Sequence, residues 1–178
     1  MKELYKKLSP SLKEKFKRCR LLAMDFDGVL TNDMVYVSQD GKEMVRCSRF
    51  DGFASELLRT YTDVAAVIVS KELNPVVKAR TKKLKTKVVQ SRTLKDKLEK
   101  LSQEIKDRDL TWNEVLYMGN DLNDIACIKK AGIGVAVKNA HPVAIKAADY
   151  VTTRPGGEGA MREVCELLMI AKGHHPAL

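Results

Sequence analysis

Residues 24–31 read MDFDGVLT, and this stretch decides the fold. An apolar run beginning at Leu21 leads into it, and Asp25 and Asp27 stand two positions apart. On a strand, alternate side chains share a face, so the two carboxylates are expected to point the same way, and Gly28 allows a sharp turn after them. Such a pair at the end of a strand suits a divalent cation and a phosphate.

The chain beyond this stretch alternates strand-like apolar runs with amphipathic segments. That order is typical of an α/β fold, a Rossmann-like three-layer sandwich with a mostly parallel sheet between helices. The pattern predicts strands at 21–26, 64–69, 86–89, 114–118, 133–136 and 149–151. Helices are expected at 52–61, 74–84, 94–106, 122–131, 141–147 and 158–171.

Two segments interrupt the alternation. Residues 34–38 and 43–47 are β-prone and flank an Asp-Gly pair at 40–41, which indicates a β-hairpin inserted after the first strand, over the sheet edge where α/β folds bind ligands. Residues 1–20 form a basic leader, expected to be helical from Ser9-Pro10 onward. We therefore expect one domain over 21–173 without a cap domain, and a frayed tail at 174–178.

Composition narrows the class of protein. The four cysteines lack zinc-ligand spacing, and no stretch approaches the length of a membrane span, so we expect a cytoplasmic protein without disulfides. The net charge is +9, with excesses of positive charge in 1–20 and 78–100. Aromatic residues do not interleave with either run, so solvated faces or attraction of a small anion are preferred over nucleic-acid binding.

Further polar residues follow the other predicted strands. Ser70 ends the run from Val64, Lys97 opens a later helix, and residues 119–124, GNDLND, follow the run 115–118. Because parallel strands present their carboxyl ends at one edge, we expect these groups to converge on the crevice that holds Asp25 and Asp27.

With these motifs the chain resembles the haloacid dehalogenase superfamily of aspartate-nucleophile phosphatases. The resemblance lies in DFDGVLT at 25–31, VIVS at 67–70, Lys97 and GNDLND at 119–124. Within that superfamily the chain is similar to small, capless members that hydrolyse phosphates of 2-keto-3-deoxy sugar acids. That narrower match rests on YVSQDGKE at 36–43, on residues 131–152 and on RPGGEGAMREVCELL at 154–168.

The resemblance implies roles for individual residues. It makes Asp25 the nucleophile that forms an aspartyl-phosphate and Asp27 the general acid and base. Ser70 and Lys97 would hold the phosphoryl oxygens, whereas Lys95 is taken as a solvated lysine. Mg²⁺ would be bound by ligands drawn from Asp25, Asp27, Asn120, Asp121 and Asp124. Thr31 is implied as a substrate-binding residue.

One position departs from the family pattern. These phosphatases usually read Gly-Asp-Asp where this chain has Gly119-Asn120-Asp121, so a neutral amide stands in place of a metal-binding carboxylate. The same Gly-Asn pair occurs in the phosphatase-like domain of animal CMP-sialic acid synthetases. An active phosphatase is preferred, and a catalytically silent oligomerisation domain is the alternative. A phospho-receiver domain is disfavoured, because its phospho-acceptor lies on a middle strand, whereas in this chain the DxDG motif opens the sheet.

The substrate prediction rests on the helix expected after Ser70. Glu72, Arg80 and Lys83 could share a helical face, offering a carboxylate to sugar hydroxyls and two cations to a substrate carboxylate. Similar enzymes for nine-carbon sugar acids combine these residue types, which favours a nonulosonate (N-acylneuraminate) 9-phosphate over 3-deoxy-manno-octulosonate 8-phosphate. Relatives form homotetramers through the hairpin, and the glycine-rich segment with Arg162 is expected to close over a neighbouring subunit's site.

Overall fold

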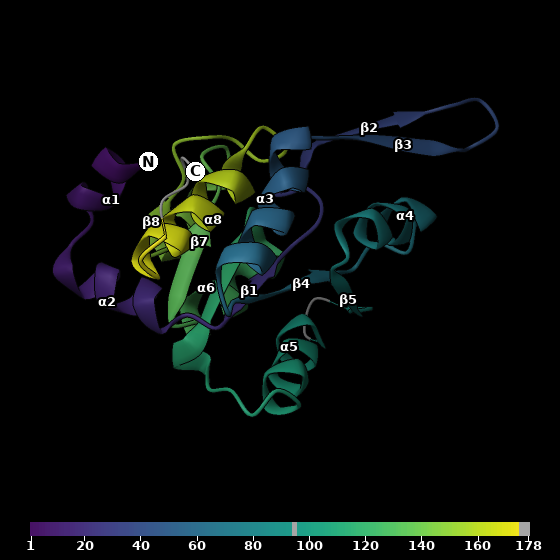
Figure 1. Cartoon of the computed structure of the whole chain (residues 1–178). Coiled ribbons are helices and arrows are strands. Elements are labelled where there is room, and N and C mark those ends of the chain that lie inside the picture. The colour runs from purple at the N-terminus through teal and green to yellow at the C-terminus, as the bar shows by residue number, and fades with distance from the viewer. Residues whose placement is uncertain (94–95, 175–178) are drawn as a thin grey trace.

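The computed structural model describes residues 1–93 and 96–174, and its centre is a six-stranded sheet (Figure 1). The strand order is β5-β4-β1-β6-β7-β8, and every neighbouring pair is parallel. The strands are β1 (Leu21–Met24), β4 (Ala65–Ser70), β5 (Lys87–Gln90), β6 (Val115–Gly119), β7 (Ile133–Ala136) and β8 (Tyr150–Val151). All residues of β1, β6 and β7 are buried, as expected for strands covered on both faces.

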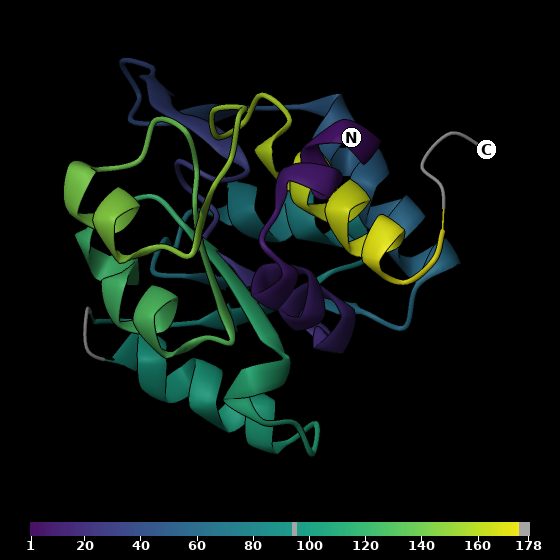
Figure 2. The same ribbon diagram turned by 90° about the vertical axis from the view of Figure 1, so that its left-hand side faces the viewer.

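Helices cover both faces of the sheet (Figures 1 and 2). One layer holds α3 (Arg49–Tyr61), α4 (Pro75–Leu84) and α8 (Ala160–Ala171), with α1 (Lys2–Lys7) and α2 (Pro10–Arg18) packed against α8. The other layer holds α5 (Asp96–Lys106), α6 (Ile125–Lys130) and α7 (Pro142–Ala147). Short 3-10 turns, η1 (Trp112–Glu114) and η2 (Leu122–Asp124), flank β6. The predicted α/β sandwich is confirmed.

A two-stranded hairpin of β2 (Thr31–Val37) and β3 (Glu43–Cys47) follows β1 and projects beyond the sheet (Figure 1). Gly41 occupies the left-handed region at its tip, with φ of 75°, which explains the Asp-Gly pair. The predicted hairpin is therefore confirmed, and it is the only regular structure between β1 and α3 in this fully described part of the chain.

Several predicted boundaries differ from the observed ones. The first strand ends at Met24 rather than at residue 26, because the chain turns there and the amide of Leu30 donates to the carbonyl of Phe26. The helix expected at 122–131 begins as the separate turn η2, which a capping box between Asp121 and Asp124 closes.

The basic leader consists of two helices rather than one. The hydroxyl of Ser9 caps α2 by accepting from the amide of Leu12, and Phe16 packs edge-to-face against Tyr150. The predicted helix start at 94, Lys95 and the last four residues of the predicted tail lie outside the described residues. Among the helices of the described ranges, none is both long and apolar enough to cross a bilayer.

Candidate active site

Asp25 follows the central strand and is nearly completely buried. Its Oδ1 accepts from the amide of Phe26 at 2.7 Å, and its Oδ2 accepts from Lys97 Nζ at 2.6 Å and Asn123 Nδ2 at 3.3 Å. Burial raises the pKa of Asp25 to about 7, and the nearby Asp124 carboxylate adds to that rise, whereas Lys97 opposes it. The carboxylate is thus fixed in place by three donors.

Lys97 joins two carboxylates inside the protein. It lies on the first turn of α5, has no exposed side-chain surface, and contacts Asp124 Oδ1 at 2.7 Å as well as Asp25. Burial lowers the pKa of Lys97, but the two carboxylates outweigh that effect, so the net shift is upward and the ammonium stays charged. Two of its three N–H donors are used, which leaves one for another acceptor.

Asp124 has no free lone pairs. Its Oδ1 accepts from Lys97 and from the Tyr117 hydroxyl at 2.7 Å, and its Oδ2 accepts from the amides of Asn120 at 2.9 Å and Asp121 at 3.3 Å. A carboxylate oxygen offers about two acceptor positions, so all four are occupied. In this arrangement Asp124 holds Lys97 and the turn after β6, and its predicted role as a metal ligand stays a prediction.

Asp27 lies two residues further along the turn and is partly exposed. Burial raises the pKa of Asp27 to about 6, and the carboxylates of Glu72 and Asp33 add to the rise. The Thr31 hydroxyl contacts Asp27 Oδ1 at 3.5 Å and accepts from the Gly28 amide at 3.0 Å. Thr31 is completely buried and its hydroxyl orders the loop that carries Asp27, while its predicted part in substrate binding stays a prediction.

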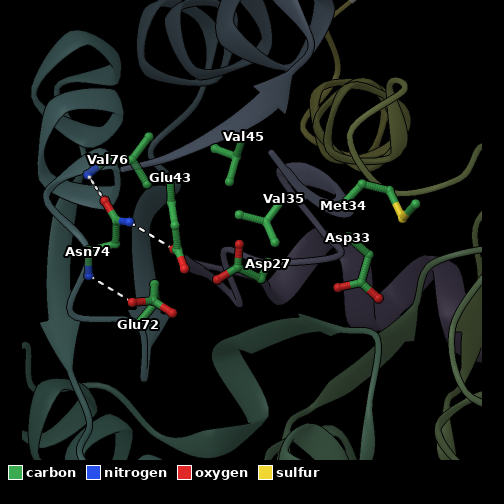
Figure 3. A pocket seen from close by; sticks show the side chains of 9 residues that line it. All are labelled: Asp27, Asp33, Met34, Val35, Glu43, Val45, Glu72, Asn74 and Val76. Atoms are coloured by element: carbon green, nitrogen blue, oxygen red, sulfur yellow. Dashed lines mark hydrogen bonds between the residues drawn. The ribbon is translucent and has the colours of Figure 1, made fainter. Parts of the chain in front are cut away.

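A cavity of about 300 Å³ opens beside Asp27, between the hairpin and the segment before α4 (Figure 3). Figure 3 shows the carboxylates of Asp27, Glu43 and Glu72 directed toward the same part of it. Asn74 braces this wall, because its side chain donates to Glu43 at 2.9 Å and its amide donates to Glu72 at 2.8 Å. The nine lining residues are Asp27, Asp33, Met34, Val35, Glu43, Val45, Glu72, Asn74 and Val76, so the wall carries four acids and no base.

Ser70 is the last residue of β4, the strand beside β1, and is almost completely buried. Its hydroxyl oxygen accepts from the amide of Glu72 at 3.0 Å. The hydroxyl proton is then available to a ligand oxygen, as the prediction requires.

The oxygen atoms around the turn suit a hard cation such as Mg²⁺. Asp25 supplies a carboxylate, the Asp27 carbonyl follows it, and the Asn120 side chain lies so close that a Cβ on Gly28 would be 2.0 Å from its Nδ2. Asp121 is exposed, and one of its oxygens caps η2 by accepting from the amide of Leu122. In the described ranges no three His, Cys, Asp or Glu side chains form a group that could hold a metal ion, and position 120 supplies an amide.

Comparison with known proteins now assigns the chain to a family. The model of the haloacid dehalogenase-like hydrolases matches residues 60–162. The 3-deoxy-D-manno-octulosonate 8-phosphate phosphatase KdsC of Escherichia coli strain B is 35% identical over 175 residues, covering 95% of this chain and 89% of the relative. The chain belongs to the haloacid dehalogenase-like hydrolase family.

Solved structures agree with this assignment. A 3-deoxy-D-manno-octulosonate 8-phosphate phosphatase from Moraxella catarrhalis, in complex with magnesium, phosphate and KDO, has a TM-score of 0.87 and 30% identity, and the match covers 93% of each chain. The cobalt-bound phosphatase YrbI of Haemophilus influenzae has a TM-score of 0.83 and 25% identity, covering 89% of this chain and 92% of that one. Family and relatives together support a phosphoric monoester hydrolase.

In this family member, two predicted substrate-binding residues lie apart from Glu72. Glu72 precedes α4, whereas Arg80 and Lys83 lie on that helix and line a different cavity of about 250 Å³, next to α3. Arg80 donates to the carbonyl of Ser48 at 2.8 Å. The prediction that one helical face presents all three residues is wrong, because the helix starts only at Pro75.

Arg162 is held within its own layer of helices. Its guanidinium lies over the Phe53 ring, 5.3 Å from the centroid, and bonds to Glu166. It does not line the cavity beside Asp27. The glycine-rich segment before it packs against residues 28–32 of the same chain, so its glycines do not require a contact with a neighbouring subunit, which stays a prediction.

Three supporting residues were missed by the sequence reasoning. Tyr117 donates to Asp124, Asn123 donates to Asp25, and Asp51 on α3 accepts from the amides of Gly159 and Arg162. Asn123 lies inside the recognised GNDLND motif and could have been considered. Tyr117 and Asp51 carry no local signal, because their roles depend on the packing of distant elements.

Proposed function

We propose that this hydrolase is a Mg²⁺-dependent phosphatase of a phosphorylated 2-keto-3-deoxy sugar acid, working through an aspartyl-phosphate on Asp25. The observation that carries the proposal is the buried set Asp25–Lys97–Asp124 next to the half-buried Asp27. Together these residues supply a fixed nucleophile, a cation for the phosphoryl group and an acid with a pKa of about 6. The Escherichia coli and Moraxella relatives support the substrate class.

In the first step, an oxygen of Asp25 attacks phosphorus and the bond from phosphorus to the sugar oxygen breaks. Asp27 gives its proton to that leaving oxygen, and a carboxyl group with a pKa of about 6 is suited to this task. The remaining N–H of Lys97 and the hydroxyl of Ser70 donate to phosphoryl oxygens, so negative charge is compensated as it develops.

In the second step, Asp27 takes a proton from water as the water oxygen attacks phosphorus. The bond from phosphorus to Asp25 breaks, which releases inorganic phosphate and restores the carboxylate. Mg²⁺, held by Asp25, the carbonyl of Asp27 and Asn120 with Asp121 nearby, would neutralise phosphoryl charge and favour the ionised form of Asp25. The donor set of hard oxygens fits this ion.

For the sugar acid itself, we propose that Glu72 accepts hydrogen bonds from hydroxyl or amine groups, since it lines the cavity that holds Asp27. This favours a nonulosonate (N-acylneuraminate) 9-phosphate, with 3-deoxy-manno-octulosonate 8-phosphate, the substrate named for the relatives, as the next candidate. Because the cavity wall carries four acids and no base, a cation for the substrate carboxylate must come from outside this wall.

We further propose a homotetramer assembled through the hairpin. Met34, Val35, Tyr36, Val37 and Met44 are all exposed there, which is unusual for a projecting ribbon that stays in water. A neighbouring copy would cover these side chains and could bring cations to the cavity, which the hairpin also lines.

A second candidate is a catalytically silent assembly domain, and Asn120 favours it. Replacing a carboxylate by an amide removes one unit of charge from the metal site and weakens its hold on a divalent cation. The exposed hairpin fits this alternative as well as it fits an enzyme.

Phosphate release decides between the two candidates. We would incubate the full chain with a panel of 2-keto-3-deoxy sugar-acid phosphates, with Mg²⁺ or with a chelator, beside Asp25→Asn. The enzyme proposal expects Mg²⁺-dependent turnover of at least one eight- or nine-carbon compound, absent in Asp25→Asn. Turnover equal to that of Asp25→Asn on every compound would overturn it in favour of the silent domain.

A further inference from the structure

A glycine-rich strap, residues 154–159, lies directly on the loop that carries Asp27. A Cβ on Gly156 would be 1.7 Å from the carbonyl oxygen of Gly28, and a Cβ on Gly157 would be 2.3 Å from the carbonyl carbon of Thr31. Both distances are far inside van der Waals contact, so the two backbones touch without any side chain between them. No larger residue fits at either position unless the loop moves.

The strap is fastened at three points by three different parts of the fold. The amide of Gly157 donates to the carbonyl of Val29 at 2.9 Å, which ties strap to loop. The amide of Gly156 donates to Asn139 Oδ1 at 2.9 Å, and the amide of Gly159 donates to the buried Asp51 at 3.2 Å. Directional hydrogen bonds therefore join the strap to the loop, to the segment before α7 and to α3.

The residues under the strap are those that orient Asp27. The Thr31 hydroxyl contacts Asp27 Oδ1 and accepts from the Gly28 amide, so the carboxylate, Gly28 and Thr31 form one hydrogen-bonded unit. The strap touches this unit at Gly28 and at Thr31. We propose that the strap is a positioning element for Asp27, with Gly156 and Gly157 as its positioning residues; this rests on the proposed function, in which Asp27 is the acid and base.

The backbone conformation of Gly156 shows that glycine is not needed there for its conformational freedom. Gly157 has a φ of 66°, which by itself favours glycine, whereas Gly156 is not among the residues with positive φ. An alanine could adopt the backbone of Gly156, so the contact with Gly28 is what excludes a side chain there. The glycine is needed for close approach to the loop.

The test compares Gly156→Ala and Gly157→Ala with Gly173→Ala. Gly173 has a φ of 86° and nothing within 4 Å of its Cβ position, so it reproduces the backbone cost at position 157 without the contact. For the sugar-acid phosphate we expect the strap variants to lose about tenfold or more in kcat with KM changed less than about threefold, because displacement of a catalytic group by an ångström is costly. Gly173→Ala should keep wild-type kcat.

A substrate with a good leaving group distinguishes positioning of the acid from general damage. p-Nitrophenolate leaves without a proton, so kcat/KM for p-nitrophenyl phosphate does not need Asp27 as an acid. The strap variants should therefore lose at least about threefold less in kcat/KM on this substrate than on the sugar-acid phosphate. An equal loss on both substrates would overturn the proposal, as would wild-type kcat in both strap variants.

Substitution of Asn139 provides a second test of the strap if the glycine variants do not fold. Asn139→Ala removes the acceptor for the Gly156 amide without inserting atoms between strap and loop, and Asn139→Asp restores an acceptor. We expect a loss of about two- to fivefold in kcat for the alanine variant, rescued by aspartate, in line with one modest hydrogen bond. Identical kcat in both variants and wild type would contradict the proposal. An inactive wild type would instead refute the proposed function.

Discussion

The loop at 25–31 and the hairpin at 31–47 adjoin in the sequence but differ in the side chains that they bury and expose. In the loop and its partners, acids and a lysine are buried, and Lys97 has no exposed side-chain surface. On the hairpin, apolar side chains are exposed, for example Met34 at 65% and Val37 at 64%. Each region thus contradicts the usual distribution of residues, and this indicates function in both.

The free-energy cost of burying the charges differs in kind from that of exposing the apolar side chains. Burying an ion pair is weak evidence for stability, because desolvation of the charges offsets their attraction, so the Asp25–Lys97–Asp124 set is better explained by chemistry. Exposed apolar surface on a ribbon is unfavourable only until another surface covers it. Chemistry and assembly should therefore be separable by mutation.

Removal of the lysine should give the largest effect. Lys97→Met leaves two buried carboxylates without their cation, so the free energy of unfolding should fall by about 3–5 kcal/mol. In the proposed mechanism Lys97 faces the phosphoryl group, so its loss should lower kcat about 10²- to 10³-fold. Denaturant titration and phosphate release measure the two quantities.

The matched control for that variant is Lys100→Met, an exposed lysine on the same helix. It should change the free energy of unfolding by less than about 0.5 kcal/mol and leave kcat unaltered. If Lys97→Met proved as stable as this control, the ion pairs would not be the closed, buried set described above.

A charge on the hairpin should affect assembly instead. Val37→Lys places an ammonium in the proposed interface, and the loss of one buried apolar side chain corresponds to roughly 10²-fold weaker association. Light scattering coupled to size-exclusion chromatography measures the molar mass of the assembly. The control is Val143→Lys, because Val143 is an exposed valine on α7, away from the hairpin. An unchanged molar mass for Val37→Lys across a dilution series would argue against assembly through the hairpin.

Substitution of Asn120 tests whether the proposed metal site lacks the negative charge needed to bind Mg²⁺ tightly. Asn120→Asp restores a carboxylate beside the Asp25–Gly28 turn, so the Mg²⁺ concentration for half-maximal activity should fall about tenfold. Without Mg²⁺ the added negative charge should lower the thermal midpoint, because Asp25 and Asp124 are close. A Mg²⁺ titration with the same midpoint for both proteins would show that the amide is no handicap.

The sequence was sufficient for the sheet, the hairpin and the convergence of Asp25 and Lys97, because each depends on local periodicity or on strand ends meeting at one edge. The hydrogen bonds of Asp124 could not be predicted, for a physical reason. Its carboxylate is saturated by Tyr117, Lys97 and two amides, and such saturation depends on packing that no spacing reveals. Arg80 was assigned by helical spacing from Glu72, but spacing is meaningful only within one helix, and that helix begins at Pro75.

The smallest expected effect is a change in substrate preference on substitution of Glu72. Glu72 lines the cavity beside Asp27, to which the hairpin contributes Glu43 and Val35. Glu72→Arg should shift the ratio of kcat/KM values toward the eight-carbon substrate by about two- to tenfold, the range expected for one hydrogen bond gained or lost in a partly exposed site. Glu72→Gln keeps the shape and an acceptor while removing the charge, so it should shift the ratio less. If both variants keep the wild-type ratio, specificity must come from groups outside this cavity wall, and in the proposed assembly those groups would be cations from a second copy at the hairpin.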